Sequence, residues 1–190
     1  MNSQIYQIYR HIHILGASGS GTTTLARELS KLLGYEHFDT DDYFWLPTTS
    51  PFTEKRPVAD RSQLLEKELK GAACWILSGS NCGWGDFLMS SYDLVIFLYV
   101  PPEIRMKRLM QREVERYSQE RISDGGDLYE NHKAFIEWAA AYDTAGPEMR
   151  SLAMHNEWLK RLNCRVIRLE GPQSVEERIK AVFKELDRQK

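Results

Sequence analysis

The chain has 190 residues, 42% of them hydrophobic and 27% charged, with a formal net charge of −2 at pH 7. This size and balance predict a single globular domain over residues 1–190. A slightly negative chain gives no electrostatic case for binding nucleic acid or an anionic membrane, and no apolar run approaches the ~20 residues of a membrane span. The cysteines Cys74, Cys82 and Cys164 lack metal-ligand spacing, which predicts reduced thiols in a cytoplasmic protein.

Strand-like and helical patterns alternate along the chain, as in a parallel sheet covered by helices on both faces. We expect strands at residues 11–15, 36–39, 73–78, 93–100 and 164–169. We expect helices at residues 22–33, 59–70, 102–117, 128–142, 147–162 and 174–187. Ligands bind such folds at the carboxyl ends of the strands, so the residues that follow each strand are the candidates for a site.

The first expected strand leads into a segment that matches the phosphate-binding motif G-x-x-x-x-G-K-[ST] in every position but one. Backbone N–H groups in such a turn, above a helix N-terminus, bind anions without a charged side chain. Thr22 occupies the lysine position, so the charge that grips the β/γ-phosphates is missing. The candidate nucleotide-binding residues are Gly16, Ala17, Ser18, Gly19, Ser20, Gly21, Thr22, Thr23 and Thr24.

Carboxylates and aromatic rings follow the second expected strand. Asp39, Asp41 and Asp42 can hold Mg²⁺ or accept a proton from a substrate hydroxyl. Tyr43 and Trp45 can stack on a flat ring or exclude water. The alternative is a solvated acidic turn, since aspartate favours turns. We favour a functional site, because this segment is expected to lie beside the phosphate loop.

Ser78 ends the third expected strand, where many phosphate-loop enzymes carry an aspartate that orients Mg²⁺. Glycines in the following turn permit close backbone approach. Ser80, Asn81 and Trp84 in the same turn suit a small-molecule pocket. A long surface turn is the alternative.

Arg112, Arg116 and Arg121 precede a glycine-containing break at residues 123–127. Arginines on a closing flap can meet a phosphoryl group during transfer, so we expect a lid over about 112–130. A solvated charged helix accounts for most other charges here.

Two further patterns concern packing. The helical spacing of Phe135, Trp138, Ala139 and Tyr142 predicts a stripe that faces the core. Ser174 and Glu177 have the spacing of a capping box at the start of the last helix.

These motifs resemble those of the small P-loop kinases: adenylate kinase and other nucleoside monophosphate kinases, and shikimate kinase. The loop Gly-Ala-Ser-Gly-Ser-Gly-Thr-Thr-Thr and the stretch Phe-Asp-Thr-Asp-Asp-Tyr-Phe-Trp are similar to those of a group of bacterial adenylate-kinase-like proteins. The resemblance covers nearly the whole chain in the order of its elements. It implies a three-layer α/β fold of the P-loop NTPase type, with a five-stranded parallel sheet in the order 2-3-1-4-5 and a helical lid.

The resemblance also implies ATP and Mg²⁺ as cofactors. Residues 16–24 would cradle the ATP phosphates, and Thr23 and Asp39 would hold Mg²⁺. Asp39 and Asp41 look like the Asp-x-Asp pair of shikimate kinase, which serves the metal and the substrate hydroxyl. Arg112, Arg116 and Arg121 look like lid arginines.

We therefore predict an ATP-dependent kinase that phosphorylates a hydroxyl or a nucleoside monophosphate, with Asp41 as the favoured base. The acidic residues favour a neutral hydroxyl acceptor. The departures at Thr22 and Ser78 leave two alternatives: a non-catalytic nucleotide-binding or regulatory protein, and a scaffold that binds a phosphorylated metabolite. The expected partners are a nucleotide and a small-molecule substrate, with no nucleic acid and no membrane, and the expected state is a monomer or homodimer.

Overall fold

The computed structural model describes residues 8–187 and contains one five-stranded parallel sheet in the order β2-β3-β1-β4-β5. The strands are β1 (His11–Gly16), β2 (Glu36–Asp39), β3 (Trp75–Ser78), β4 (Leu94–Tyr99) and β5 (Arg165–Glu170). The predicted fold class and strand order are confirmed. This order sets the carboxyl ends of β1, β2 and β3 beside one another.

Helices connect the strands and close both faces of the sheet. They are α2 (Thr22–Leu33), α3 (Thr40–Phe44), α4 (Val58–Gly71), α5 (Pro102–Tyr117), α6 (Gln119–Ile122), α7 (Tyr129–Ala140), α8 (Leu152–Lys160) and α9 (Val175–Asp187). Two short 3₁₀ helices are η1 (Asp86–Ser91) and η2 (Ala141–Asp143). No helix within residues 8–187 is both long and apolar enough to cross a membrane.

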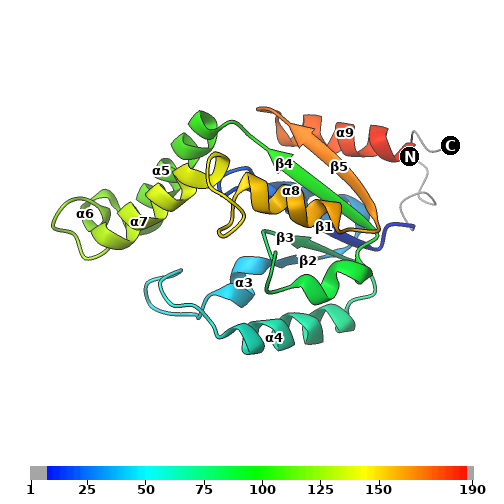
Figure 1. Cartoon of the computed structure of the whole chain (residues 1–190), viewed down its shortest axis with the longest axis horizontal. Helices are drawn as coiled ribbons and strands as arrows, with labels where there is room; N and C mark the ends of the chain where they lie inside the picture. The colour runs from blue at the N-terminus through cyan, green and yellow to red at the C-terminus, as the bar shows by residue number, and fades with distance from the viewer. Residues whose placement is uncertain (1–7, 188–190) are drawn as a thin grey trace.

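Two apolar clusters lie between the sheet and the helices that cover its faces. Figure 1 shows the arrangement of those helices. Leu25 and Leu29 of α2 pack with α9 on one face, and Leu65 of α4 packs with Trp158 of α8 on the other. The run from Leu94 to Leu98 in β4 is fully buried, as expected of a strand covered on both sides. The sheet therefore forms the buried centre of the described structure.

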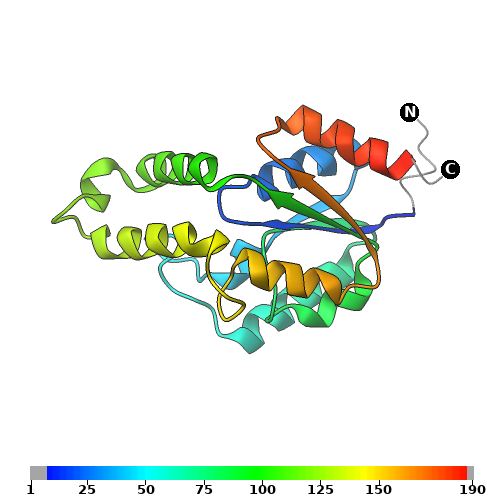
Figure 2. The same cartoon turned by 45° about the horizontal axis from the view of Figure 1, so that its top comes forward.

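A helical hairpin extends from the carboxyl edge of the sheet. α5 and α7 run side by side, and α6 lies at the tip (Figure 2). The segment 112–130, expected to act as a lid, comprises the end of α5, α6 and the turn into α7. Its position beyond the sheet edge suits a lid, and lid motion stays a prediction.

The helix boundaries differ from the predicted ones where caps decide them. The helix expected at 147–162 begins only at Leu152, because the Ser151 side chain accepts a hydrogen bond from Met154 N at 3.0 Å and donates one to Gly146 O at 2.7 Å. The capping box is confirmed: Ser174 N donates to Glu177 Oε2 at 2.7 Å, and Glu177 N donates to Ser174 Oγ at 3.2 Å.

Candidate functional site

The phosphate loop takes its shape from glycines. Gly16 ends β1 where an added Cβ would lie 2.5 Å from the Leu98 carbonyl oxygen. Gly19 and Gly21 have φ of 80° and 88°, a region that favours glycine. Gly21 is also the N-cap of α2, so the loop leads directly into a helix N-terminus. This arrangement can bind phosphate through backbone N–H groups.

Three elements meet at the Asp39 carboxylate, which lies at the end of β2. Thr23 Oγ1 of α2 donates to Asp39 Oδ2 at 2.7 Å, and Ser78 Oγ of β3 donates to the same oxygen at 3.0 Å. Asp39 Oδ1 accepts from Asp41 N at 3.1 Å, which caps α3. Thus Asp39 brings a carboxylate against Ser78, the residue that stands where many phosphate-loop enzymes carry an aspartate.

This cluster fits Mg²⁺. The Thr23 proton points to Asp39, so the hydroxyl oxygen keeps its lone pairs for a cation. Mg²⁺ is typically held by one or two carboxylates together with substrate phosphates. Within residues 8–187 no group of three or more His, Cys, Asp or Glu side chains is placed to hold a metal ion.

Asp41 lies two residues beyond Asp39, at the start of α3. Solvent reaches its side chain, yet enough protein surrounds the carboxylate that desolvation raises its pKa, and the charge of Asp39 raises it further. Arg150, Arg112 and Arg116 act in the opposite direction. A carboxylate with a raised pKa amid three cations is suited to accept a proton from a bound hydroxyl.

The prediction that a stripe of α7 faces the core is wrong for Phe135 and Trp138. Ala139 and Tyr142 are buried, but Phe135 and Trp138 are half-buried and face arginines. The Arg112 guanidinium lies 6.0 Å from the Phe135 ring centroid, and the Arg150 guanidinium lies 4.7 Å from that of Trp138. These rings orient two cations of the site by cation–π contact.

Arg61 of α4 is a further cation that the sequence did not reveal. It is 8% exposed, and its guanidinium lies 4.2 Å from the Phe44 ring centroid and 5.1 Å from that of Trp84. Its Nε and Nη1 have no hydrogen-bond partner in the described part of the chain. Two unsatisfied donors on a sandwiched cation can receive an anionic ligand.

The predicted substrate residues divide into accessible and inward-facing ones. Asp42 is exposed, and Trp45 is half-buried and packs edge-on against Phe44. Tyr43 is buried and donates to Glu68, while Asn81 is fully buried and donates to Tyr92 Oη at 2.7 Å. Tyr43 and Asn81 therefore shape the walls, and direct contact of either with a substrate stays a prediction.

A chain of two hydrogen bonds through the buried His155 holds Ser80. Its Oγ lies 2.9 Å from His155 Nε2, and His155 Nδ1 lies 2.8 Å from Tyr142 Oη. Burial lowers the pKa of His155 to about 3, so the ring is neutral at pH 7. Burial raises the pKa of the nearby Cys82 thiol to about 12, which disfavours the thiolate form.

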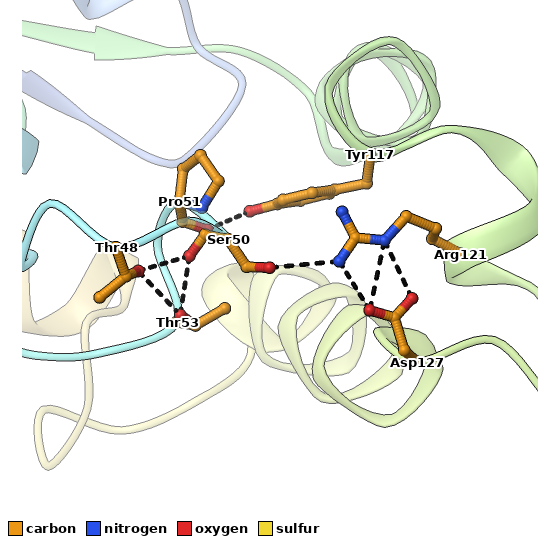
Figure 3. A network of polar contacts seen from close by, with 7 residues as sticks. All are labelled: Thr48, Ser50, Pro51, Thr53, Tyr117, Arg121 and Asp127. Carbon is orange, nitrogen blue, oxygen red and sulfur yellow. Dashed lines mark hydrogen bonds and ion pairs between the residues drawn. The ribbon is translucent and has the colours of Figure 1, made fainter.

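Of the three predicted lid arginines, Arg121 is placed differently from the others. Its Nη2 contacts Asp127 Oδ2 at 2.6 Å and Ser50 Oγ at 3.2 Å (Figure 3). Tyr117 Oη donates to the Pro51 carbonyl at 2.6 Å beside it. These contacts join the segment predicted to be a lid to the loop between α3 and α4. The charges of Arg112 and Arg116 act on Asp41, whereas the interactions of Arg121 within residues 8–187 stay on that segment and this loop.

Two hollows on the described surface lie away from this cluster. One, of about 420 Å³, lies between β5 and α9, and the other, of about 440 Å³, lies between β5 and α8. Neither hollow contains a residue of the phosphate loop or of α3, so neither coincides with the cluster of hydrogen bonds and charges at the candidate site.

Comparison with known proteins agrees with this geometry. A family model described as an AAA domain matches residues 12–134. Uncharacterized protein YqaC of Bacillus subtilis is 51% identical over 174 residues, which cover 92% of this chain and 96% of that protein. Cytidylate kinase of Archaeoglobus fulgidus is 28% identical over 117 residues, which cover 54% of this chain and 61% of the kinase, less than two thirds of its length.

Solved structures of small-molecule kinases share the fold. A shikimate kinase from Acinetobacter baumannii, solved in complex with shikimate, aligns with a TM-score of 0.56 and 16% identity, covering 97% of this chain and 98% of that one. At that identity the likeness concerns the fold alone. With the family match over residues 12–134 and the full-length likeness to YqaC, the chain belongs to the AAA-domain family of P-loop kinases.

Proposed function

We propose that this protein transfers a phosphoryl group from ATP to a hydroxyl of a small anionic metabolite. The observation that carries the proposal is the convergence of Thr23, Asp39 and Ser78 at the edge of the phosphate loop, with Asp41 two residues further on. Kinases of small molecules among the sequence relatives support the reaction type.

On the nucleotide side, the loop amides would bind the phosphate chain, and Thr23 and Asp39 would hold Mg²⁺. The bound ion supplies charge neutralisation to the phosphoryl group in transfer. Asp39 keeps the Thr23 hydroxyl oriented, which lowers the cost of assembling the site.

On the acceptor side, Asp41 would take the proton of the acceptor hydroxyl while the new O–P bond forms and the bond to the departing ADP breaks. Arg61 and Arg150, each stacked on aromatic rings, would bind a carboxylate or phosphate of the acceptor. The sequence favoured a neutral acceptor. We now favour an anionic acceptor, because Arg112 and Arg116 add further positive charge around Asp41.

The test is ADP release measured by a coupled assay, with Mg²⁺-ATP and a panel of hydroxy acids, sugar phosphates, nucleoside monophosphates and neutral sugars or nucleosides. We expect turnover with a member of the anionic groups and weak or no turnover with the neutral ones. D41N is expected to abolish it. Absence of turnover with every acceptor, in protein that binds ATP by calorimetry, contradicts the proposal.

Thr22 favours one competing function, a nucleotide-binding protein without transfer. That protein would bind ATP and release no ADP with any acceptor. In it, T22K would change the affinity for ATP without producing turnover, whereas in a working kinase the same variant changes the rate.

A further inference from the structure

Arg178 of α9 reaches the phosphate loop from the far end of the sequence. Its Nη1 donates a hydrogen bond to the Ser20 carbonyl at 2.7 Å, and the residue is 4% exposed. A Cβ placed on Gly21 would lie 3.1 Å from the same nitrogen. The guanidinium therefore packs directly against the loop.

This cation is not neutralised. Within residues 8–187, Arg178 forms no ion pair and its Nε has no hydrogen-bond partner. Arg108 of α5 adds a second charge, since its Nη1 donates to the Gly19 carbonyl at 3.4 Å. Burial and the neighbouring Arg108 both lower the pKa of Arg178. An anion on the loop would offset the cost of these unpaired charges.

The loop lacks a charge where its motif normally carries one, at Thr22. We propose that Arg178, assisted by Arg108, supplies the phosphate loop with the positive charge that Thr22 does not, and fixes the loop through its hydrogen bond to Ser20. This inference rests on the proposed function, in which the anion is the phosphate chain of ATP. Arg178 acts through the loop and is a positioning residue.

A purely structural role for Arg178 makes a different prediction. An arginine that only fills the space between α9 and the loop would affect every ligand of the site alike. It would also be insensitive to a charge introduced at position 22. A charge-supplying arginine affects phosphate-bearing ligands selectively, and a lysine in the loop can replace it.

The test is calorimetric titration of ATP, and separately of adenosine, into wild-type protein and the R178Q, R178K and R178Q/T22K variants. R178Q is expected to weaken ATP binding about tenfold and adenosine binding by less than about twofold, because only ATP carries phosphate charge. R178K is expected to stay near wild type, and T22K in the R178Q background to recover most of the loss. K180Q, at an exposed position of the same helix, is the matched control and is expected to bind as wild type.

Three outcomes would overturn the inference: R178Q binds ATP like wild type, R178Q loses ATP and adenosine equally, or T22K restores nothing. If R178Q fails to fold in a thermal melt, R108Q with and without T22K carries the same test, since Arg108 is exposed. Wild-type protein that binds no ATP overturns both the proposed function and this inference. Wild-type protein that binds ATP with the expected R178Q effect but transfers nothing overturns the kinase reaction alone.

Discussion

Replacing Asp39 by asparagine tests the centre of the proposed site. In the wild type, Asp39 Oδ2 accepts hydrogen bonds from Thr23 at 2.7 Å and Ser78 at 3.0 Å. The variant's amide nitrogen turns a donor toward two hydroxyls that each donate. Hydroxyls can rotate to accept, so we count the net loss of one hydrogen bond to a charged group, about 1.5–3 kcal/mol. If that loss falls on the transition state, Mg²⁺-dependent turnover drops about 10- to 150-fold.

The assay is ADP release against Mg²⁺ concentration, for wild type, D39N and the control E36Q, with a thermal melt of each protein. Glu36 lies exposed at the opposite end of the same strand, so E36Q removes a carboxylate from β2 without touching the cluster. We expect D39N to lose turnover and to require more Mg²⁺, while E36Q matches wild type. Turnover and Mg²⁺ requirement of D39N within about twofold of wild type would refute the reasoning, since the lost interaction would then be worth less than ~0.4 kcal/mol.

Three further predictions follow from the same geometry. Because the pKa of Asp41 is raised in the folded protein, ionisation of Asp41 destabilises the fold at neutral pH, and D41N should raise the melting temperature at pH 7 while abolishing turnover. The difference in stability between D41N and wild type should close as the pH falls toward the unfolded-state pKa of about 3.9. An unchanged melting temperature contradicts this prediction. In steady-state kinetics, R61M and R150M should each raise KM for the acceptor about tenfold or more, with KM for ATP within about twofold of wild type. Equal effects on both KM values would show that these arginines do not bind the acceptor. Burial lowers the pKa of His155 to about 3 and that of His13 to about 4, so only the unfolded chain binds these protons below about pH 6.5. As the pH is lowered from about 6.5 toward the folded-state pKa values, urea melts should show the free energy of unfolding falling, with a limiting slope of about 1.4 kcal/mol per pH unit for each histidine. H155Q should remove the contribution of His155 to that slope.

The fold could be predicted wherever local pattern and final burial agree. The apolar run from Leu94 to Leu98 ends up covered on both sides, and the capping box at Ser174 forms as its spacing indicates. The five-residue helix α3 was missed because it is shorter than two helical turns and shows no period. The start of α8 was misplaced because a cap at Ser151, rather than the apolar pattern, decides it.

Only those residues of the candidate site that lie at the ends of strands could be predicted from the sequence. Thr23 lies just after β1 and Asp39 ends β2, while Ser78 ends β3 between these two parallel strands. The meeting of the three residues therefore follows from the strand order. Arg61, Arg150 and Arg178 each reach the site by tertiary packing from separate parts of the chain. Arg61 and Arg178 lie on helices, where an arginine looks the same in sequence whether it faces solvent or a ligand. Arg150 lies in the turn before α8, so no local signal distinguished these three.

The hydrogen bond from Arg178 to the Ser20 carbonyl also couples the phosphate loop to the last described helix, α9. The glycine motif is complete by residue 24, yet one of its carbonyls is satisfied only when the last described helix has docked. Anything that loosens α9 therefore removes a hydrogen bond from the loop, and a ligand that orders the loop stabilises α9 by the same free energy. Nucleotide should thus slow amide hydrogen exchange in a helix that shares no residue with the motif, which makes α9 a reporter of occupancy at the opposite end of the chain.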